Sequence, residues 1–380
     1  MNNRRNLISA IIYQLIHIIY GLVVPRIILL YFGSEINGLV SSITQFLSFI
    51  SLLEGGLGAV VLAELYLPIE TDDGETVKRI ISSSQSLFHK LSFFYVLYTV
   101  VLGVIYSVSV RESFGFTLVF ELTIILSLAT LAEYLFSISY RLLLQADQKI
   151  YITNYVYTTV MLVNIAVALF VVHVYPEIRL LKFFSSIAFF VQPVILRFFI
   201  PKKYCTAGLF PYEKYPLNNR WSGFAQNLAH FINMNTDIVL ITIFCSYSDV
   251  SVYTVYMLAI NALRMIVTSA ADSYQGALGK YIAQGDPKLL YRNFDRFFVV
   301  VCGASLALFC TCLLLINPFV ALYTTDVNDI NYYHPEFALI ILAANLVYCF
   351  REPFRLLILA AGKFKETNFG SIMEAVLNGK

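Results

Sequence analysis

Two segments far apart in the chain carry nearly the same polar sequence. The first, RLLLQADQKIYITN, runs from Arg141 to Asn154, and the second, RLLILAAGKFKETN, runs from Arg355 to Asn368, an offset of 214 residues. At this offset the region 128–154 matches 342–368 with eleven identities and no gap, among them Arg, Lys, Thr and Asn. Shared hydrophobicity produces matching Leu and Ala, but it does not produce charged and amide residues in register. The chain is therefore predicted to contain an internal repeat.

The composition around these segments is that of a membrane protein. Apolar residues make up 58% of the chain and charged residues only 13%, with a mean hydropathy of +0.72, whereas soluble domains carry about 25% charged residues. Apolar runs of about 20 residues are long enough to cross a ~30 Å hydrocarbon core as helices. Ten complete runs are predicted at 7–30, 36–63, 87–110, 117–139, 151–174, 180–200, 222–245, 250–273, 294–316 and 334–353.

An eleventh run begins near Thr367, and the sequence ends inside it at Lys380. Strands of a membrane barrel show alternating segments of about ten residues, and these runs are apolar throughout. The predicted fold class is therefore an all-α polytopic membrane protein, truncated in its eleventh helix.

The distribution of positive charge predicts the orientation of the chain. Twenty of the 26 Lys and Arg residues fall on the side of the N-terminus, three fall on the opposite side, and the others lie within the spans or at the C-terminus. Cytoplasmic connections are enriched in Lys and Arg, so the N-terminus and both repeated polar segments are expected in the cytoplasm. The inner connections near 64–86, 201–221 and 274–293 are basic and amphipathic and are expected to lie along the membrane surface.

The offset of the repeat predicts how the two copies are related. It corresponds to six spans, an even number, so both copies have the same orientation in the membrane. We expect an N-terminal six-helix bundle at 1–210 and a second, incomplete bundle at 211–380 that holds helices 7–10 and the start of helix 11. Parallel bundles of this kind are a transporter architecture, in which the substrate path lies between two halves that rock against each other.

Two arginines lie within predicted spans, where an ionisable side chain is costly and marks a functional candidate. Arg26 lies late in the first span and either reaches the outer interface with its side chain or lines a cavity. Pro25 beside it is expected to kink or open the helix. Arg264 lies deeper, with about two helical turns of apolar residues on either side, which favours a role facing a cavity.

A second group of polar residues closes the segment HFINMNTD at 230–237. His230, Asn233 and Asp237 share one helical face by their spacing. They form either an interhelical hydrogen-bond network, with Arg264 as an ion partner, or a site for substrate or a coupling ion. In the first bundle, His17 is either a packed histidine or a ligand.

No catalytic, metal or cofactor motif accompanies these residues. The six cysteines lack the spacing of a zinc site, and the sequence has neither a nucleophile elbow nor the phosphate loop GxxxxGK[ST]. We expect no metal, no cofactor, no enzymatic activity and no nucleic-acid partner.

Several stretches resemble the polysaccharide transport branch of the MATE/MOP exporter superfamily. They are YFGSEINGLVSSITQFLSFISLLEGGLGAVV (31–61), AHFINMNTDIVLITIF (229–244), SAADSYQGALGKYIAQGD (269–286) and the two repeated segments. The resemblance implies two six-span bundles around a central cavity. It also implies a flippase that moves an undecaprenyl-pyrophosphate-linked oligosaccharide across the bacterial cytoplasmic membrane by alternating access, for surface polysaccharide synthesis.

A cavity arginine suits a pyrophosphate because guanidinium pairs with phosphate oxygens bidentately. Arg264 and Arg26 are the candidates for this role, with Asn233, Asn235 and Asp237 nearer the sugar or a coupling cation, Na⁺ or H⁺. His17 completes the candidate set, and membrane lipids are further partners.

Two other functions compete with the flippase. A MATE-type antiporter would exchange organic cations for Na⁺ or H⁺ and would favour buried acidic residues in the first bundle, where Arg26 and His17 are found instead. A membrane glycan polymerase or ligase would need a long outer loop and no parallel repeat, and both of these features disagree with the sequence.

Overall fold

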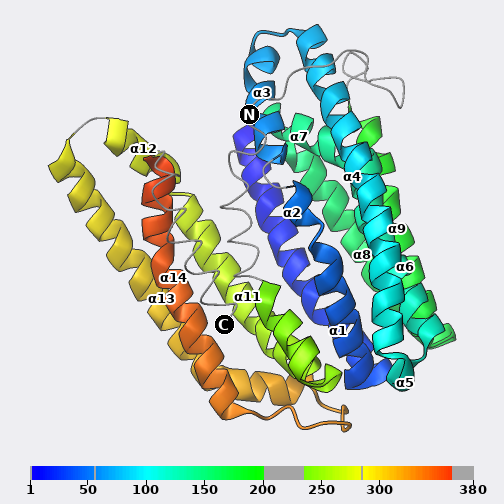
Figure 1. Ribbon diagram of the computed structural model, residues 1–380. Helices are drawn as coiled ribbons and strands as arrows, with labels where there is room; N and C mark the ends of the chain where they lie inside the picture. Colours follow the sequence, from blue (N-terminus) through cyan, green and yellow to red (C-terminus); the bar gives the residue numbers. More distant parts are fainter. Residues whose placement is uncertain (1, 55–56, 201–234, 284–285, 362–380) are drawn as a thin grey trace. The chain divides into compact units, whose positions relative to one another are not determined.

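The computed structural model describes residues 2–54, 57–200, 235–283 and 286–361, and within these ranges the chain is helical and has no strand (Figure 1). The first part of the chain forms α1 (Asn2–Ser48), α2 (Ser51–Glu54), α3 (Leu57–Glu70), α4 (Gly74–Ser109), α5 (Arg111–Phe114), α6 (Phe116–Ala132), the π-helix η1 (Glu133–Ser137), α7 (Ile138–Ala146), α8 (Ile150–Val174) and α9 (Ile178–Phe198). After a helical segment at Asn235–Phe244 come α11 (Tyr247–Asp272), α12 (Gln275–Ala283), α13 (Pro287–Tyr323) and α14 (Pro335–Ala360).

These helices confirm the prediction of an all-α polytopic membrane protein. Within the described ranges, eight helices or continuous helical stretches are long and apolar enough to cross a membrane. Many of their large apolar side chains face outward, and in α13 alone Leu314 is 77% and Val300 is 68% exposed. Lipid is the solvent that makes such a surface stable, because it favours apolar contacts where water does not.

The predicted spans coincide with observed helices except at 36–63, whose described residues are divided among the end of α1, α2 and α3. The helix α1 also departs from the prediction at its bend. This helix contains the span 7–30 and the start of the span 36–63, and the two meet at Gly33, whose backbone (φ 81°, ψ 175°) is not helical. The helical backbone continues through Pro25, so the expected interruption lies eight residues later than predicted. The second half of the span 222–245 is described, whereas the predicted start of the eleventh helix lies outside the described residues.

The inner connections are more helical than the sequence analysis predicts. The segment expected at 64–86 consists of the end of α3, three residues, and the first turns of α4. Along this part of α4, Val77, Ile80, Ile81 and Phe88 are buried in the protein. Their apolar face therefore packs against neighbouring helices and not along a membrane surface.

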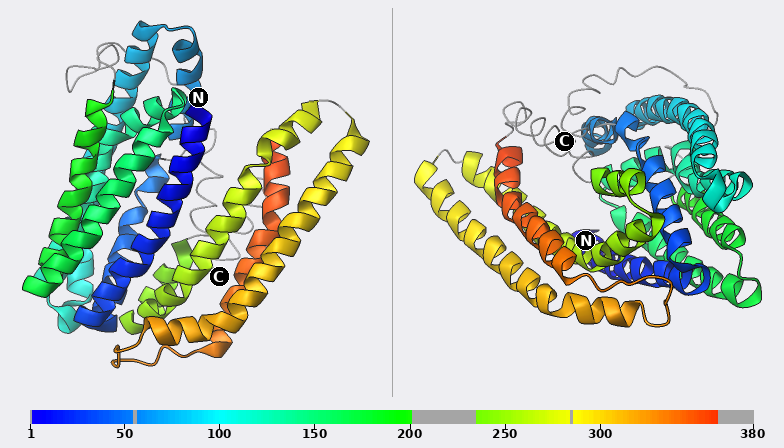
Figure 2. Two further views of the ribbon diagram at one scale, coloured as in Figure 1. Left: turned by 180° about the vertical axis from the view of Figure 1, so that it is seen from behind. Right: turned by 60° about the horizontal axis from the view of Figure 1, so that its bottom comes forward.

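The chain divides into two compact units, which we describe separately. The first contains residues 1–32 and 39–239. In it α4, α6, α8 and α9 pack side by side, with α8 against α9 and α6 against both α4 and α9 (Figures 1 and 2). Its interior includes an aromatic group in which the ring of Tyr134 stacks on Phe88 at 6.4 Å and meets Tyr95 edge-on at 6.0 Å.

The second unit contains residues 33–38 and 240–380. Here α11, α13 and α14 pack against one another, and α12 packs on α13 and α14. Side chains define the starts of two helices: Ser246 and Asp249 form a capping box at α11, and Asp286 accepts hydrogen bonds from the first amides of α13. Such caps satisfy backbone donors that a helix end leaves without partners.

Candidate functional site

In the second unit, two arginines meet at one aromatic ring. Arg264, on α11, places its guanidinium carbon 4.2 Å from the centroid of the Tyr348 ring on α14. Arg351, one turn beyond Tyr348 on α14, has its guanidinium carbon 5.0 Å from the same centroid. Cation–π attraction operates within about 6 Å of a ring centroid, so the tyrosine holds both cations near one point.

A third arginine lies one turn further along α14 and is neutralised by carboxylates. Arg355 donates from Nε to Glu352 Oε2 at 2.7 Å and from Nη2 to Asp272 Oδ1 at 2.8 Å. Glu352 is fully buried, and a buried carboxylate is stable as a charge only when it is paired. Both of these carboxylates thus bind Arg355.

The positions of these residues place the cluster along a line. Tyr348, Arg351 and Arg355 follow one another at three- and four-residue spacing, which puts them on one face of α14. On α11, Arg264 lies eight residues before Asp272, a rise of about 12 Å at 1.5 Å per residue. The cationic groups therefore extend from the end of α11 towards its middle.

The first unit contains the other candidates that the structure describes. Arg26 is half-buried in α1. His17 lies beside Tyr13 on the same helix, with their ring centroids 5.8 Å apart, and Tyr13 meets Tyr157 of α8 at 6.1 Å. The histidine is thus part of an aromatic contact between α1 and α8.

Asn235 and Asp237 lie in the described helical segment Asn235–Phe244. The amide nitrogen of Gln45 donates a hydrogen bond to Asn235 Oδ1, which joins this segment to α1 within the first unit. Asp237 is exposed. Asn233, like His230, lies outside the described residues.

Several polar residues near the ends of the spans are structural partners, which the sequence did not reveal. Arg141 of α7 lies 2.6 Å from Glu133 Oε1, at the start of the π-helix. Tyr134 donates to Glu54 Oε2 at 3.3 Å. Arg141 and Arg355 occupy the same column of the repeat, and each pairs with a carboxylate on its own span. Their charges thus pair with carboxylates near the helix ends.

Sequence reasoning identified Arg264 but missed Arg351 and Tyr348. Arg351 was counted only as a charge of an inner connection, because it lies close to the end of an apolar run. The signal that could have found it is the spacing of Tyr348, Arg351 and Arg355 on one face of a predicted helix.

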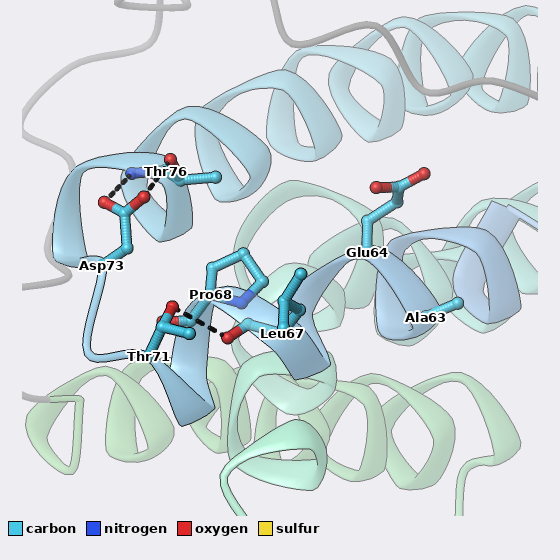
Figure 3. A pocket seen from close by; sticks show the side chains of 7 residues that line it. All are labelled: Ala63, Glu64, Leu67, Pro68, Thr71, Asp73 and Thr76. Carbon is cyan, nitrogen blue, oxygen red and sulfur yellow. Dashed lines mark hydrogen bonds between the residues drawn. The ribbon is translucent and has the colours of Figure 1, made fainter.

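The structure also has a surface pocket of about 490 Å³ between α3 and the start of α4 (Figure 3). Its lining residues are Ala63, Glu64, Leu67, Pro68, Thr71, Asp73 and Thr76. Asp73 accepts from the Thr76 amide at 3.1 Å and from the Thr76 hydroxyl at 2.6 Å, and these bonds lower the pKa of its carboxyl. The carboxylate therefore serves as the cap of α4. Among the described residues, no three His, Cys, Asp or Glu side chains lie close enough to hold a metal ion.

Comparison with solved structures identifies the fold. The chain is similar to the inward-facing conformation of a multidrug resistance MATE family transporter of the MOP superfamily, with a TM-score of 0.54 and 14% identity over 96% of this chain and 82% of that one. It is also similar to a MATE protein in the bent conformation, with a TM-score of 0.53 and 14% identity over 99% of this chain and 94% of the other. No family model and no curated protein sequence matches the chain. The chain has the fold of MATE transporters, a fold of multi-pass membrane proteins.

Proposed function

We propose that this protein is an alternating-access transporter that carries an undecaprenyl-pyrophosphate-linked oligosaccharide to the outer leaflet of the bacterial cytoplasmic membrane. The MATE fold supports a membrane transporter. The substrate is proposed from the chemistry of the second unit, where Arg264 and Arg351 converge on Tyr348.

This convergence is the observation that carries the proposal. Two guanidinium groups near one ring concentrate positive charge, and this attracts an anion. A pyrophosphate offers several oxygens in a compact group, and guanidinium binds such oxygens through paired hydrogen bonds. Tyr348 keeps both side chains in place before the ligand arrives, which lowers the entropy that binding costs.

The same observation disfavours an organic cation as the cargo. A drug cation needs a carboxylate or an aromatic face that no protein cation already occupies. Around Tyr348 the ring is engaged by two arginines, and Glu352 and Asp272 both pair with Arg355. The MATE-type multidrug antiporter is nevertheless the second candidate, because a structural neighbour is described as a multidrug resistance transporter.

We assign the remaining candidates to the same transport cycle. Arg26 serves the pyrophosphate as a second cationic position, and His17 with Asn235 and Asn233 lies on the sugar side of the path. Asp237 is the proposed position for the coupling cation, Na⁺ or H⁺, since it is an exposed acidic residue.

The proposed architecture follows the repeat. In this proposal residues 1–210 and 211–380 form two parallel halves. The N-terminus and the two repeated segments face the cytoplasm, where the excess of Lys and Arg is expected.

Deletion of the gene tests the proposed substrate directly. In the deletion strain, surface polysaccharide should be lost while its lipid-linked precursor accumulates on the cytoplasmic side. Restoration of both by the intact gene is the control. Normal surface polysaccharide together with increased drug sensitivity would refute the flippase and favour the multidrug antiporter.

A series of arginine variants tests the site itself. Arg264→Ala and Arg351→Ala should each reduce export at least tenfold, and Arg264→Lys should recover only part of it because lysine lacks the bidentate geometry. Arg79→Ala is the matched control, since Arg79 pairs with Glu75 on an exposed face of α4 at 3.0 Å. Export is compared at equal membrane levels of each variant. Unchanged export by Arg264→Ala and Arg351→Ala would remove both residues from the site.

A further inference from the structure

The short segment Gly33–Gly38 of α1 belongs to the second unit, although the residues before and after it belong to the first. It begins at Gly33, where the helical backbone is interrupted at φ 81° and ψ 175°. Only glycine adopts this region readily. The segment is thus a corner between the first two spans, with a glycine at either end.

Ser34 connects this corner by hydrogen bonds to the segment between α13 and α14. Its backbone amide donates to Asp329 Oδ2 at 2.6 Å, and its hydroxyl donates to Asp329 Oδ1 at 2.7 Å. The hydroxyl oxygen also lies 2.6 Å from the phenol oxygen of Tyr332. Ser34 is fully buried and Tyr332 is 4% exposed, so the bond between their hydroxyl groups is shielded from competing water, whereas Asp329 is exposed.

Asn37 forms a hydrogen bond that connects the corner to α11. Its amide donates to Ser251 Oγ at 2.8 Å, and Ser251 Oγ lies 2.9 Å from the Tyr332 phenol. Tyr256, also on α11, donates to the carbonyl of Tyr332 at 2.9 Å. One continuous network therefore joins the corner, α11 and the connection before α14. Burial raises the pKa of the Tyr332 phenol, which keeps its proton available for the network.

The network also joins equivalent positions of the repeat. Asn37 and Ser251 are 214 residues apart, the same offset that relates the repeated segments. The backbones are closest here as well, because a Cβ on Gly38 would lie 1.8 Å from the carbonyl oxygen of Tyr247. The two copies of the corner, 34–38 and 248–252, thus lie against each other.

We propose that Gly33–Gly38 is a permanent pivot, which stays bound to α11 and the 327–334 connection through the whole transport cycle while the backbone at Gly33 absorbs the movement. The proposal rests on the proposed function only in requiring a cycle of movement, and not on the substrate. Separation would leave the buried side chains of Asn37, Ser251 and Tyr332 without their partners, which is the costly outcome for a hydrogen-bond network.

A reversible cross-link distinguishes a pivot from a gate that opens in each cycle. In protein whose native cysteines have been replaced, Asn37→Cys and Ser251→Cys are combined and oxidised to a disulfide, which mass spectrometry of the linked peptides verifies. Glu112 and Asn328, both exposed, are each replaced by a genetically encoded amino acid with a ketone side chain. A donor dye and an acceptor dye are then coupled to the two ketones. Single-molecule energy transfer between the dyes then follows the movement without any substrate.

For a pivot, oxidised and reduced protein should visit the same set of energy-transfer states, and export should differ by less than twofold between them. Collapse to one state on oxidation, reversed by a reductant, would overturn the proposal and identify a gate. A single state in the reduced protein, or failure of the disulfide to form, would also overturn it. An error in the proposed substrate would give a different result: the wild-type protein would change state but would export no lipid-linked oligosaccharide.

Discussion

Gly38 has the closest backbone contact of the glycines whose surroundings the structure describes. A Cβ at this position would lie 1.8 Å from Tyr247 O and 2.6 Å from Tyr247 C. Both are backbone atoms, so no side-chain rotation relieves the overlap. We expect Gly38→Ala to destabilise the protein by about 1–3 kcal/mol, the usual range for overpacking, as measured by thermal unfolding in detergent.

Gly21→Ala is the matched control for this substitution. Gly21 lies in the same helix, and a Cβ there has no heavy atom within 4 Å. Alanine should therefore be neutral or stabilise the helix by up to about 1 kcal/mol through its higher propensity. Equal melting temperatures for the two variants would contradict the close approach of Gly38 to Tyr247.

For single residues, the sequence indicated a candidate for the site where a charged residue lies in an apolar segment. Arg264 was found because a charge in the middle of an apolar run requires a partner or a cavity. Tyr348 gave no such signal, because aromatic residues make up 15% of the chain. The bond between Asn37 and Ser251 was also hidden, although the offset of 214 was known, because an offset does not say which equivalent residues touch.

At the scale of helices, the two arginines that match in the repeat have unequal partners. Arg355 pairs with the fully buried Glu352, whereas Arg141 pairs with Glu133, whose side chain is 35% exposed. Loss of an arginine that leaves a buried carboxylate behind costs about 3–5 kcal/mol, and solvent reduces this because Arg355 is itself 34% exposed. We expect Arg355→Ala to cost about 2–3 kcal/mol and Arg141→Ala about 1 kcal/mol or less.

Thermal unfolding of the two variants measures this difference. The double variant Arg355→Met with Glu352→Gln should recover much of the loss, because it removes the buried charge together with its partner. If Arg141→Ala proves as destabilising as Arg355→Ala, burial of the acidic partner is not the cause.

Hydrophobic runs predicted where helices lie, but not their local irregularities. The π-helix at Glu133–Ser137 lies inside the predicted span 117–139, and one additional residue in a turn leaves no trace in hydropathy. The corner at Gly33 was likewise hidden, because Pro25 was the more conspicuous helix breaker. In α1 the backbone stays helical at Pro25, and the chain turns at Gly33, whose φ is positive.

For the whole molecule, the fold was predictable and the cargo was not. Composition and span length determine an all-α membrane protein, and the parallel repeat anticipates a transporter architecture. The MATE fold was found in structures only 14% identical to this chain. One fold serves many substrates through side chains in its sites, so the cargo has to be argued from Arg264 and Arg351 and then tested.

The predicted orientation of the chain in the membrane can be tested on one helical stretch. The stretch Phe116–Ala146 is 31 residues long, which corresponds to about 45 Å at 1.5 Å per residue and exceeds the hydrocarbon thickness. Glu112 lies just before it and Gln145 lies at its far end, and both are exposed. In a cysteine-free background, a membrane-impermeant maleimide added to spheroplasts should label Glu112→Cys at once and Gln145→Cys only after permeabilisation. Labelling of both from outside would show that this stretch does not cross the membrane, and the reverse order would place the excess of Lys and Arg on the outer side.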